Sequence, residues 1–122
     1  MLSFIKSLLK SFQYAWDGIR FCFGVEKNLT IMLIISIISI IGGFYFKISN
    51  TEWLVSLILI TGVFSLELFN TAMEKFLDLF YPEKNEKVKN IKDLMAGGVA
   101  IVSIGAGIIG VIIFLPKILT LF

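Results

Sequence analysis

The chain has 122 residues, of which 57% are hydrophobic, and a formal net charge of +2 at neutral pH. It is too short for two domains and too apolar for an ordinary soluble domain, so one small membrane domain is expected. The low charge argues against a nucleic-acid-binding surface, and the absence of histidine, with Cys22 as the only cysteine, excludes a histidine base, a zinc site built from thiolates and an intrachain disulfide.

Residues 1–25 are predicted to form an amphipathic helix that lies on the membrane surface. Apolar residues recur at helical spacing from Ile5 to Phe23, while polar and charged residues such as Lys10 and Arg20 line the other side. A soluble domain would pack such a helix against its core, but no soluble domain follows here. The charges within the segment also distinguish it from a secretory signal peptide, so we expect it in the mature protein.

Three segments are predicted to span a bilayer: residues 28–47, 53–80 and 90–119. The first and the third contain long stretches, 28–46 and 94–116, without any Asp, Glu, Lys or Arg. The second is equally apolar over residues 53–73 except for one acid, Glu67. The expected fold is therefore an all-α membrane protein with a surface helix followed by three transmembrane helices.

The basic residues are distributed unevenly around these segments. Nine of the eleven lysines and arginines precede the first span or surround the loop after the second, and two lie on the other side. The positive-inside rule then places the N-terminus and the 81–92 loop in the cytoplasm, with the 47–52 turn and the C-terminus outside. Pro82 and its polar neighbours, residues 81–85, are expected to form the cytoplasmic loop itself.

Small residues form a stripe along the third span. Their spacing of three and four residues places them on one face of the helix, where they allow close helix packing: Ala96, Ala100, Ser103, Gly107 and Gly110. Because three spans bury little surface by themselves, the chain is expected to form an oligomer.

The second span carries a column of polar residues on one helix face, flanked by Asn70: Glu67, Thr71, Glu74 and Asp78. Acids near a helix end can reach water or pair with Lys75. This explanation accounts for Asp78 and also covers Glu74. Glu67 is different, because it lies roughly 10 Å deeper than Glu74 at 1.5 Å per residue. An ionisable group at that depth in a membrane is expected to be functional.

The predicted topology brings further polar groups to the level of Glu74. The first span begins at the cytoplasmic face and the third begins there too, which places Glu26, Lys92 and Asp93 beside Glu74. Carboxylate and amide oxygens next to the cytosol suit Mg²⁺ with nucleotide phosphates, and Lys92 can add positive charge. Glu67, deeper in the membrane, can deprotonate a lipid hydroxyl. Alternatively, Glu26 is only part of a polar helix start, and Lys92 and Asp93 only a solvated helix end.

At these residues the sequence resembles the bacterial integral-membrane diacylglycerol kinase and undecaprenol kinase family. The resemblance covers almost the whole chain, and the pattern of acids and amide in the second span followed by Lys-Asp is specific to the family. It rests on four motifs: Trp16-x-Gly18-Ile19-Arg20, Glu26-x-Asn28, the run Glu67-Leu68-Phe69-Asn70-Thr71-Ala72-Met73-Glu74 with Asp78, and Lys89-x-x-Lys92-Asp93-x-x-Ala96-Gly97-Gly98-Val99.

The resemblance implies a homotrimer with active sites shared between subunits, in the bacterial cytoplasmic (inner) membrane. Each site would phosphorylate a lipid alcohol, diacylglycerol or undecaprenol, with Mg²⁺ and ATP. By matching positions, Glu67 would be the catalytic base, and Glu26 and Glu74 would hold the metal with ATP. The nucleotide would also contact Asn70, Lys92 and Asp93, and three further residues are candidates for supporting roles: Asn28, Asp78 and Lys89.

Two departures limit what the resemblance implies. Members of the family often follow Glu-x-Asn with a basic residue and a histidine, whereas Leu29, Thr30 and Ile31 follow here. Gly98 stands where alanine is usual. No role is therefore transferred to the residues after Asn28.

Two other functions stay open from the residues alone. An intramembrane acid such as Glu67 also occurs in proton-coupled transporters and channels, and helix packing alone would suit an inactive scaffold or accessory subunit. Within the kinase hypothesis, apolar walls discriminate poorly between lipid tails. The residues found in two motifs, Glu26-x-Asn28 and Phe69-Asn70-Thr71, modestly favour a polyprenol over a diacylglycerol as the substrate.

Overall fold

The computed structural model describes all 122 residues as helices joined by short loops, without a strand. The helices are α1 (Leu2–Val25), α2 (Lys27–Tyr45), α3 (Asn50–Phe80) and α4 (Glu86–Leu119). Three of them, α2, α3 and α4, are long and apolar enough to cross a membrane. The predicted all-α class with three spans is confirmed.

The two longest helices begin earlier than the apolar segments that predicted them. The Ser49 hydroxyl accepts a hydrogen bond from the Glu52 backbone N–H at 3.2 Å, and the Glu52 carboxylate accepts one from the Ser49 backbone N–H at 3.0 Å. This capping box starts α3 at Asn50. The Asn85 side chain caps α4 in the same way by accepting from the backbone of Lys87. Polar caps therefore extend both helices beyond their apolar cores.

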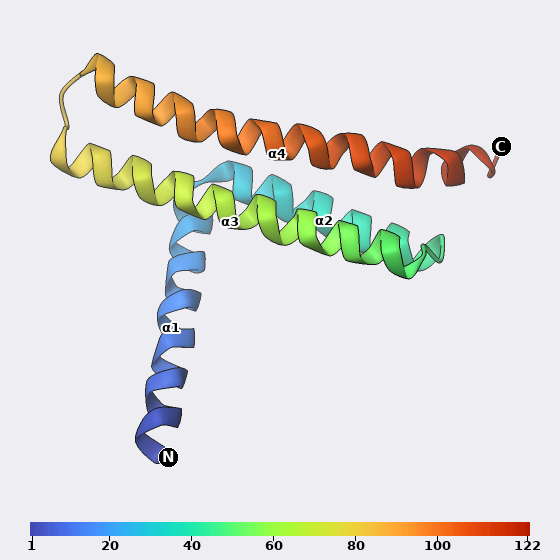
Figure 1. Cartoon of the computed structure of the whole chain (residues 1–122), viewed down its shortest axis with the longest axis horizontal. Helices are drawn as coiled ribbons and strands as arrows, with labels where there is room; N and C mark the ends of the chain where they lie inside the picture. Colours follow the sequence, from blue (N-terminus) through green and yellow to red (C-terminus); the bar gives the residue numbers. More distant parts are fainter.

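Helix α1 runs across the direction of the other three helices, which lie along one another (Figure 1). The chain changes direction at Glu26, whose extended backbone (φ −122°, ψ 110°) separates α1 from α2. Cys22 and Leu29, on either side of this break, are buried at 2% and 1% exposure. Both sides of the corner are therefore buried, and Glu26 lies at the start of α2.

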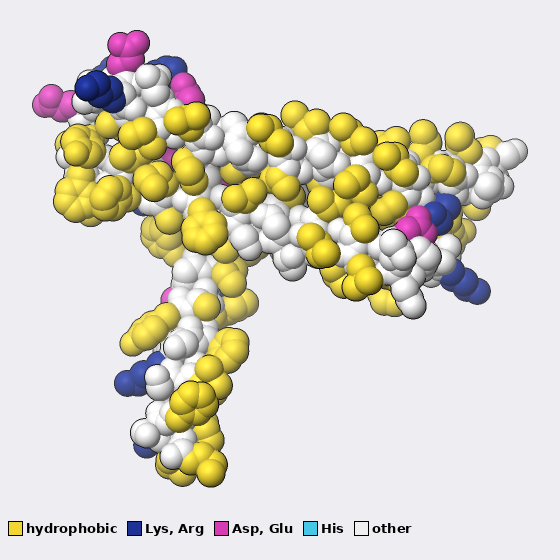
Figure 2. Space-filling model, in the orientation of Figure 1, with side chains coloured by type: hydrophobic (Ala, Val, Ile, Leu, Met, Phe, Trp, Pro, Cys, Tyr) yellow, Lys and Arg dark blue, Asp and Glu magenta, His cyan; other side chains and the backbone are white.

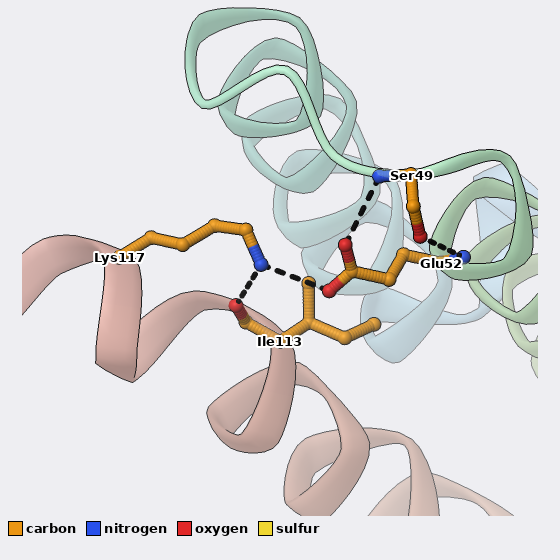
Figure 3. A network of polar contacts seen from close by, with 4 residues as sticks. All are labelled: Ser49, Glu52, Ile113 and Lys117. Atoms are coloured by element: carbon orange, nitrogen blue, oxygen red, sulfur yellow. Dashed lines mark hydrogen bonds and ion pairs between the residues drawn. The ribbon is translucent and has the colours of Figure 1, made fainter.

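Helices α3 and α4 form an antiparallel hairpin and make the most extensive contact in the chain. At its loop end, near residues 81–85, the Lys92 ammonium donates to the Asp78 carboxylate. At its far end, the Lys117 ammonium donates to the Glu52 carboxylate and to the Ile113 carbonyl, both at 2.9 Å (Figure 3). These two ion pairs hold the register of the hairpin at both ends.

The turn between α2 and α3 depends on the lack of a side chain at Gly43. A Cβ atom there would lie 2.6 Å from the Trp53 ring and 3.1 Å from the Ile48 side chain. Lys47 in this turn has a positive φ of 51°, a left-handed conformation that few residues other than glycine adopt. The close approach of Trp53 therefore fixes how α2 meets α3.

A single chain buries few of its side chains, and apolar side chains cover the visible length of the bundle, with charged groups gathered towards its two ends (Figure 2). The predicted small-residue stripe of α4 does not make a close helix contact within one chain. A Cβ atom at Gly107 or Gly110 would meet nothing within 4 Å. A lipid or another chain can therefore approach the backbone of α4 closely at these two glycines.

Candidate functional site

The candidate site centres on Glu67, which lies on α3 where the span meets α1 and α2. Its side chain is 2% exposed, although it is ionisable. Asn70 and Thr71, one turn nearer the loop end, are buried at 6% and 4%. The Asn70 carbonyl oxygen and the Thr71 hydroxyl have no hydrogen-bond partner. Because buried polar groups are normally paired, this cluster of unpaired groups points to a ligand-binding or catalytic role.

The charges of the two predicted metal ligands, Glu26 at the start of α2 and Glu74 on α3, act on Glu67. Asn70 lies about one helical turn along α3 from Glu67. Glu26 also accepts a hydrogen bond from the Asn28 backbone N–H at 3.3 Å. The sequence predicted these acids at one end of the bundle, and the break after α1 places Glu26 at the start of α2.

None of these three carboxylates forms an ion pair. All three ion pairs in the chain involve other acids, namely Glu52, Asp78 and Asp93. Several carboxylates without a nearby cation repel one another, and the repulsion is strongest where one of them is buried. None of the three carboxylates is therefore neutralised by an ion pair within the chain, and a bound cation would supply such a partner.

The donor set fits Mg²⁺ better than a metal that needs a closed protein cage. No three His, Cys, Asp or Glu side chains lie close enough together to hold an ion by themselves. Mg²⁺ usually takes only one or two carboxylates and keeps water and phosphate oxygens as its other ligands. Glu26 and Glu74 are both half-buried and unpaired, so they can serve as such a pair.

Lys92 lies on α4 and is tied to α3 rather than to the acids around Glu67. Its ammonium pairs with the Asp78 carboxylate, one helical turn from Glu74. The Lys92 side chain is 34% exposed, so it is accessible beside the site. From the sequence alone, exposure to water was enough to explain Asp78. In the structure, Asp78 orients Lys92.

Three other residues singled out from the sequence lie at the exposed edge of this region. Lys89 and Asp93 pair with each other at 2.7 Å along α4, and their side chains are 72% and 63% exposed. Asn28 is exposed and contacts Glu26 through its backbone. The loop half of the bundle therefore holds Glu26, Glu67, Asn70 and Glu74 together with the Lys92–Asp78 pair, while Lys89, Asp93 and the Asn28 side chain are exposed.

Sequence reasoning missed Ser103 as a member of this region. Glu67 lies eleven residues before Asp78 and Ser103 lies eleven residues after Lys92, so the Asp78–Lys92 pair places them at the same level of the antiparallel hairpin. The Ser103 hydroxyl is buried without a hydrogen-bond partner. Complementary charges at the ends of two adjacent spans were the signal that could have fixed this register.

Comparison with known proteins adds an independent line of information. Residues 13–114 match the family model described as prokaryotic diacylglycerol kinase. The chain is 37% identical over 113 residues to an undecaprenol kinase of Bacillus subtilis, covering 93% of this chain and 92% of that protein. It is 33% identical over 116 residues to a diacylglycerol kinase of Synechocystis sp., covering 94% of this chain and 66% of that protein.

Proposed function

The chain belongs to the prokaryotic diacylglycerol kinase family and is a multi-pass membrane lipid kinase, and from this premise we propose that it transfers a phosphoryl group from ATP to the hydroxyl of a membrane lipid alcohol at the cytoplasmic face. The observation that carries the proposal is the buried, unpaired Glu67 with Glu26 and Glu74 beside it. A carboxylate at this depth meets a lipid hydroxyl, whereas ATP stays near the aqueous surface.

In this proposal the lipid hydroxyl oxygen attacks the terminal phosphorus of ATP while the bond from that phosphorus to the bridging oxygen breaks and ADP leaves. Glu67 accepts the proton of the hydroxyl. A positioned general base typically contributes about a hundredfold to ten-thousandfold in rate. Asn70, about one helical turn along α3 from Glu67, is placed to orient this carboxylate. Burial excludes bulk water from Glu67, which favours transfer to the lipid over hydrolysis of ATP.

Glu26 and Glu74 would hold Mg²⁺ together with the ATP phosphates, because neither acid is neutralised by an ion pair within the chain. When bound, the ion would supply positive charge against the phosphates. Lys92, kept beside the site by Asp78, contacts the same phosphates. Asp93 and Lys89 lie further out and serve the nucleotide only at the edge of the site.

The membrane arrangement follows from the charges and from the direction of α1. The loop end of the bundle, rich in lysine, faces the cytoplasm of a bacterial cell across its inner membrane. Helix α1 lies along that surface, with Phe12 and Trp16, exposed at 67% and 59%, in the lipid. The apolar faces that one chain leaves exposed are covered in part by other subunits of a homotrimer that share the active sites.

Phosphoryl transfer from labelled ATP to undecaprenol and to diacylglycerol in mixed micelles tests the proposal. Transfer should require Mg²⁺ and a lipid alcohol, and Glu67→Gln should reduce it by about a hundredfold or more. Glu83→Gln, in the exposed loop, is the matched control and should keep full activity. Full activity of Glu67→Gln would remove Glu67 as the base. ATP turnover that does not depend on lipid would contradict the whole proposal, as would proton uptake without transfer.

A further inference from the structure

Thr71 on α3 carries a buried hydroxyl that no other group in the chain uses. The residue is 4% exposed, and its Oγ1 atom has no hydrogen-bond partner. Buried polar side chains are normally paired, so a hydroxyl left unpaired at this depth calls for an explanation. The roles derived above for Glu67, Glu74 and Asn70 do not supply one.

Other hydroxyls within the helices find a partner on their own backbone. Thr61, ten residues earlier on α3, donates to the Leu57 carbonyl at 2.9 Å. Ser36 on α2 likewise donates to the carbonyl four residues before it, at 2.7 Å. Thr71 does not make the corresponding bond to the Glu67 carbonyl. Its hydrogen is therefore free for a group that binds in the site.

Thr71 lies between Glu67 and Glu74 on the face of α3 that carries the acids. At 1.5 Å per residue, it lies about 6 Å from the level of Glu67 and about 4.5 Å from the level of Glu74. In the proposed function, Glu67 meets the lipid hydroxyl, and Glu74 lies with the ATP phosphates. The phosphorus atom that passes from ATP to the lipid must cross the interval between these two levels, and Thr71 lies in that interval.

Three buried side-chain atoms lack a partner, and they differ in what they can bind: Asn70 Oδ1, Thr71 Oγ1 and Ser103 Oγ. An ionised phosphoryl oxygen only accepts hydrogen bonds, so the Asn70 carbonyl oxygen cannot bind it. Ser103 can donate, but it lies level with Glu67 and lines an apolar groove between α2, α3 and α4 that Thr71 does not line. Of the three atoms, only Thr71 Oγ1 offers a donor at the level of the transferred group.

We propose that Thr71 is a further catalytic residue, whose hydroxyl donates a hydrogen bond to a non-bridging oxygen of the phosphoryl group as that group is transferred. The proposal rests on the lipid kinase function above and adds a residue to the same site. The lipid oxygen bonds to phosphorus as the bond to the bridging oxygen breaks, and the Thr71 proton stays on Thr71. A donor already fixed in a buried site stabilises the charge on the transferred oxygens without having to reorganise.

Two substitutions at Thr71 test this role. Thr71→Val removes the hydroxyl and keeps a β-branched side chain of nearly the same shape, whereas Thr71→Ser keeps the hydroxyl. We expect Thr71→Val to lower kcat by about a hundredfold, while the KM for ATP and the KM for the lipid each change by less than about twofold. Thr71→Ser should keep kcat within about threefold of the wild-type value, because serine supplies the same donor.

Thr61→Val is the matched control, since Thr61 is exposed on the same helix and its hydroxyl is already bonded to Leu57. This variant should keep full activity. Thermal unfolding in detergent then separates catalysis from folding. Because Thr71→Val replaces a buried hydroxyl that has no partner, the midpoint should stay unchanged or rise. A lower midpoint that accompanies the loss of activity would show a structural role and overturn the proposal.

Three kinetic results would also overturn it. The first is a kcat for Thr71→Val within about twofold of wild type, and the second is a loss that Thr71→Ser does not recover. The third is a rise in the lipid KM alone, which would mean that the hydroxyl binds the lipid alcohol instead. Each of these leaves the lipid kinase function intact if the wild-type protein transfers phosphate and Glu67→Gln does not. A wild-type protein that transfers no phosphate would overturn both proposals.

Discussion

Lys92 on α4 donates a hydrogen bond to Asp78 on α3, and this contact joins the two longest helices at the end where Glu74 lies. The pair has two consequences. It fixes the register that places Ser103 level with Glu67. It also holds the Lys92 ammonium against α3, one helical turn from Glu74. In the proposed function, Asp78 therefore acts through Lys92 rather than on the substrate.

Asp78→Asn should weaken ATP binding without removing the chemistry. A partly exposed ion pair contributes about 0.2–1 kcal/mol, so the KM for ATP should rise by about fivefold or less. The KM for the lipid should stay unchanged, because Glu67 is untouched. Steady-state kinetics with each substrate varied in turn separates the two constants. The conservative variant Asp78→Glu should recover the wild-type KM for ATP, and a rise in the lipid KM alone would contradict this role.

Lys117→Met should destabilise the hairpin at its far end. The substitution keeps the apolar stem but leaves the half-buried Glu52 carboxylate without its partner, which costs more than losing both charges. The midpoint of thermal unfolding in detergent should fall for Lys117→Met, and Glu52→Gln in the same chain should restore part of the loss. No recovery in the double variant would show that the pair does not account for the effect.

Gly43→Ala should lower stability because the added methyl group would overlap the Trp53 ring. Overpacking of this kind typically costs about 1–3 kcal/mol. Gly62→Ala is the matched control in the adjacent span, where a Cβ atom meets nothing within 4 Å. That control should be neutral or slightly stabilising, since alanine is the better helix former. Equal midpoints of thermal unfolding for the two variants would contradict the close approach of Trp53 to α2.

Trp16 should report the proposed position of α1 at the membrane surface. In a Trp53→Phe background, Trp16 is the only tryptophan, and its side chain is 59% exposed in the chain itself. Fluorescence in lipid nanodiscs should be quenched more strongly by lipids brominated near the headgroup than by lipids brominated near the tail end. Strong quenching by an aqueous quencher, with none by brominated lipid, would place α1 away from the membrane.

Much of the fold was predictable because hydropathy and helical periodicity are local properties. The uncharged stretches of the first and third spans and the single acid of the second marked three transmembrane helices, and α1 ends at Val25 where the apolar pattern ends. The early starts of α3 and α4 were missed, since they depend on caps at Ser49 and Asn85 rather than on hydrophobicity. Close helix packing at the small-residue stripe stays a prediction, because a Cβ atom at Gly107 or Gly110 meets nothing within 4 Å in one chain.

The sequence by itself determined which groups are available: the acids of α3 share one helix face, and their depth follows from the rise per residue. Only the tertiary structure decided which of them lie near groups from other helices. The charge of Glu26 acts on Glu67 because the chain turns at the end of α1, and Asp78 pairs with Lys92 because α3 and α4 pack in one register. The physical reason is that charges interact through space over a few ångströms, so separation along the chain does not predict which groups become partners.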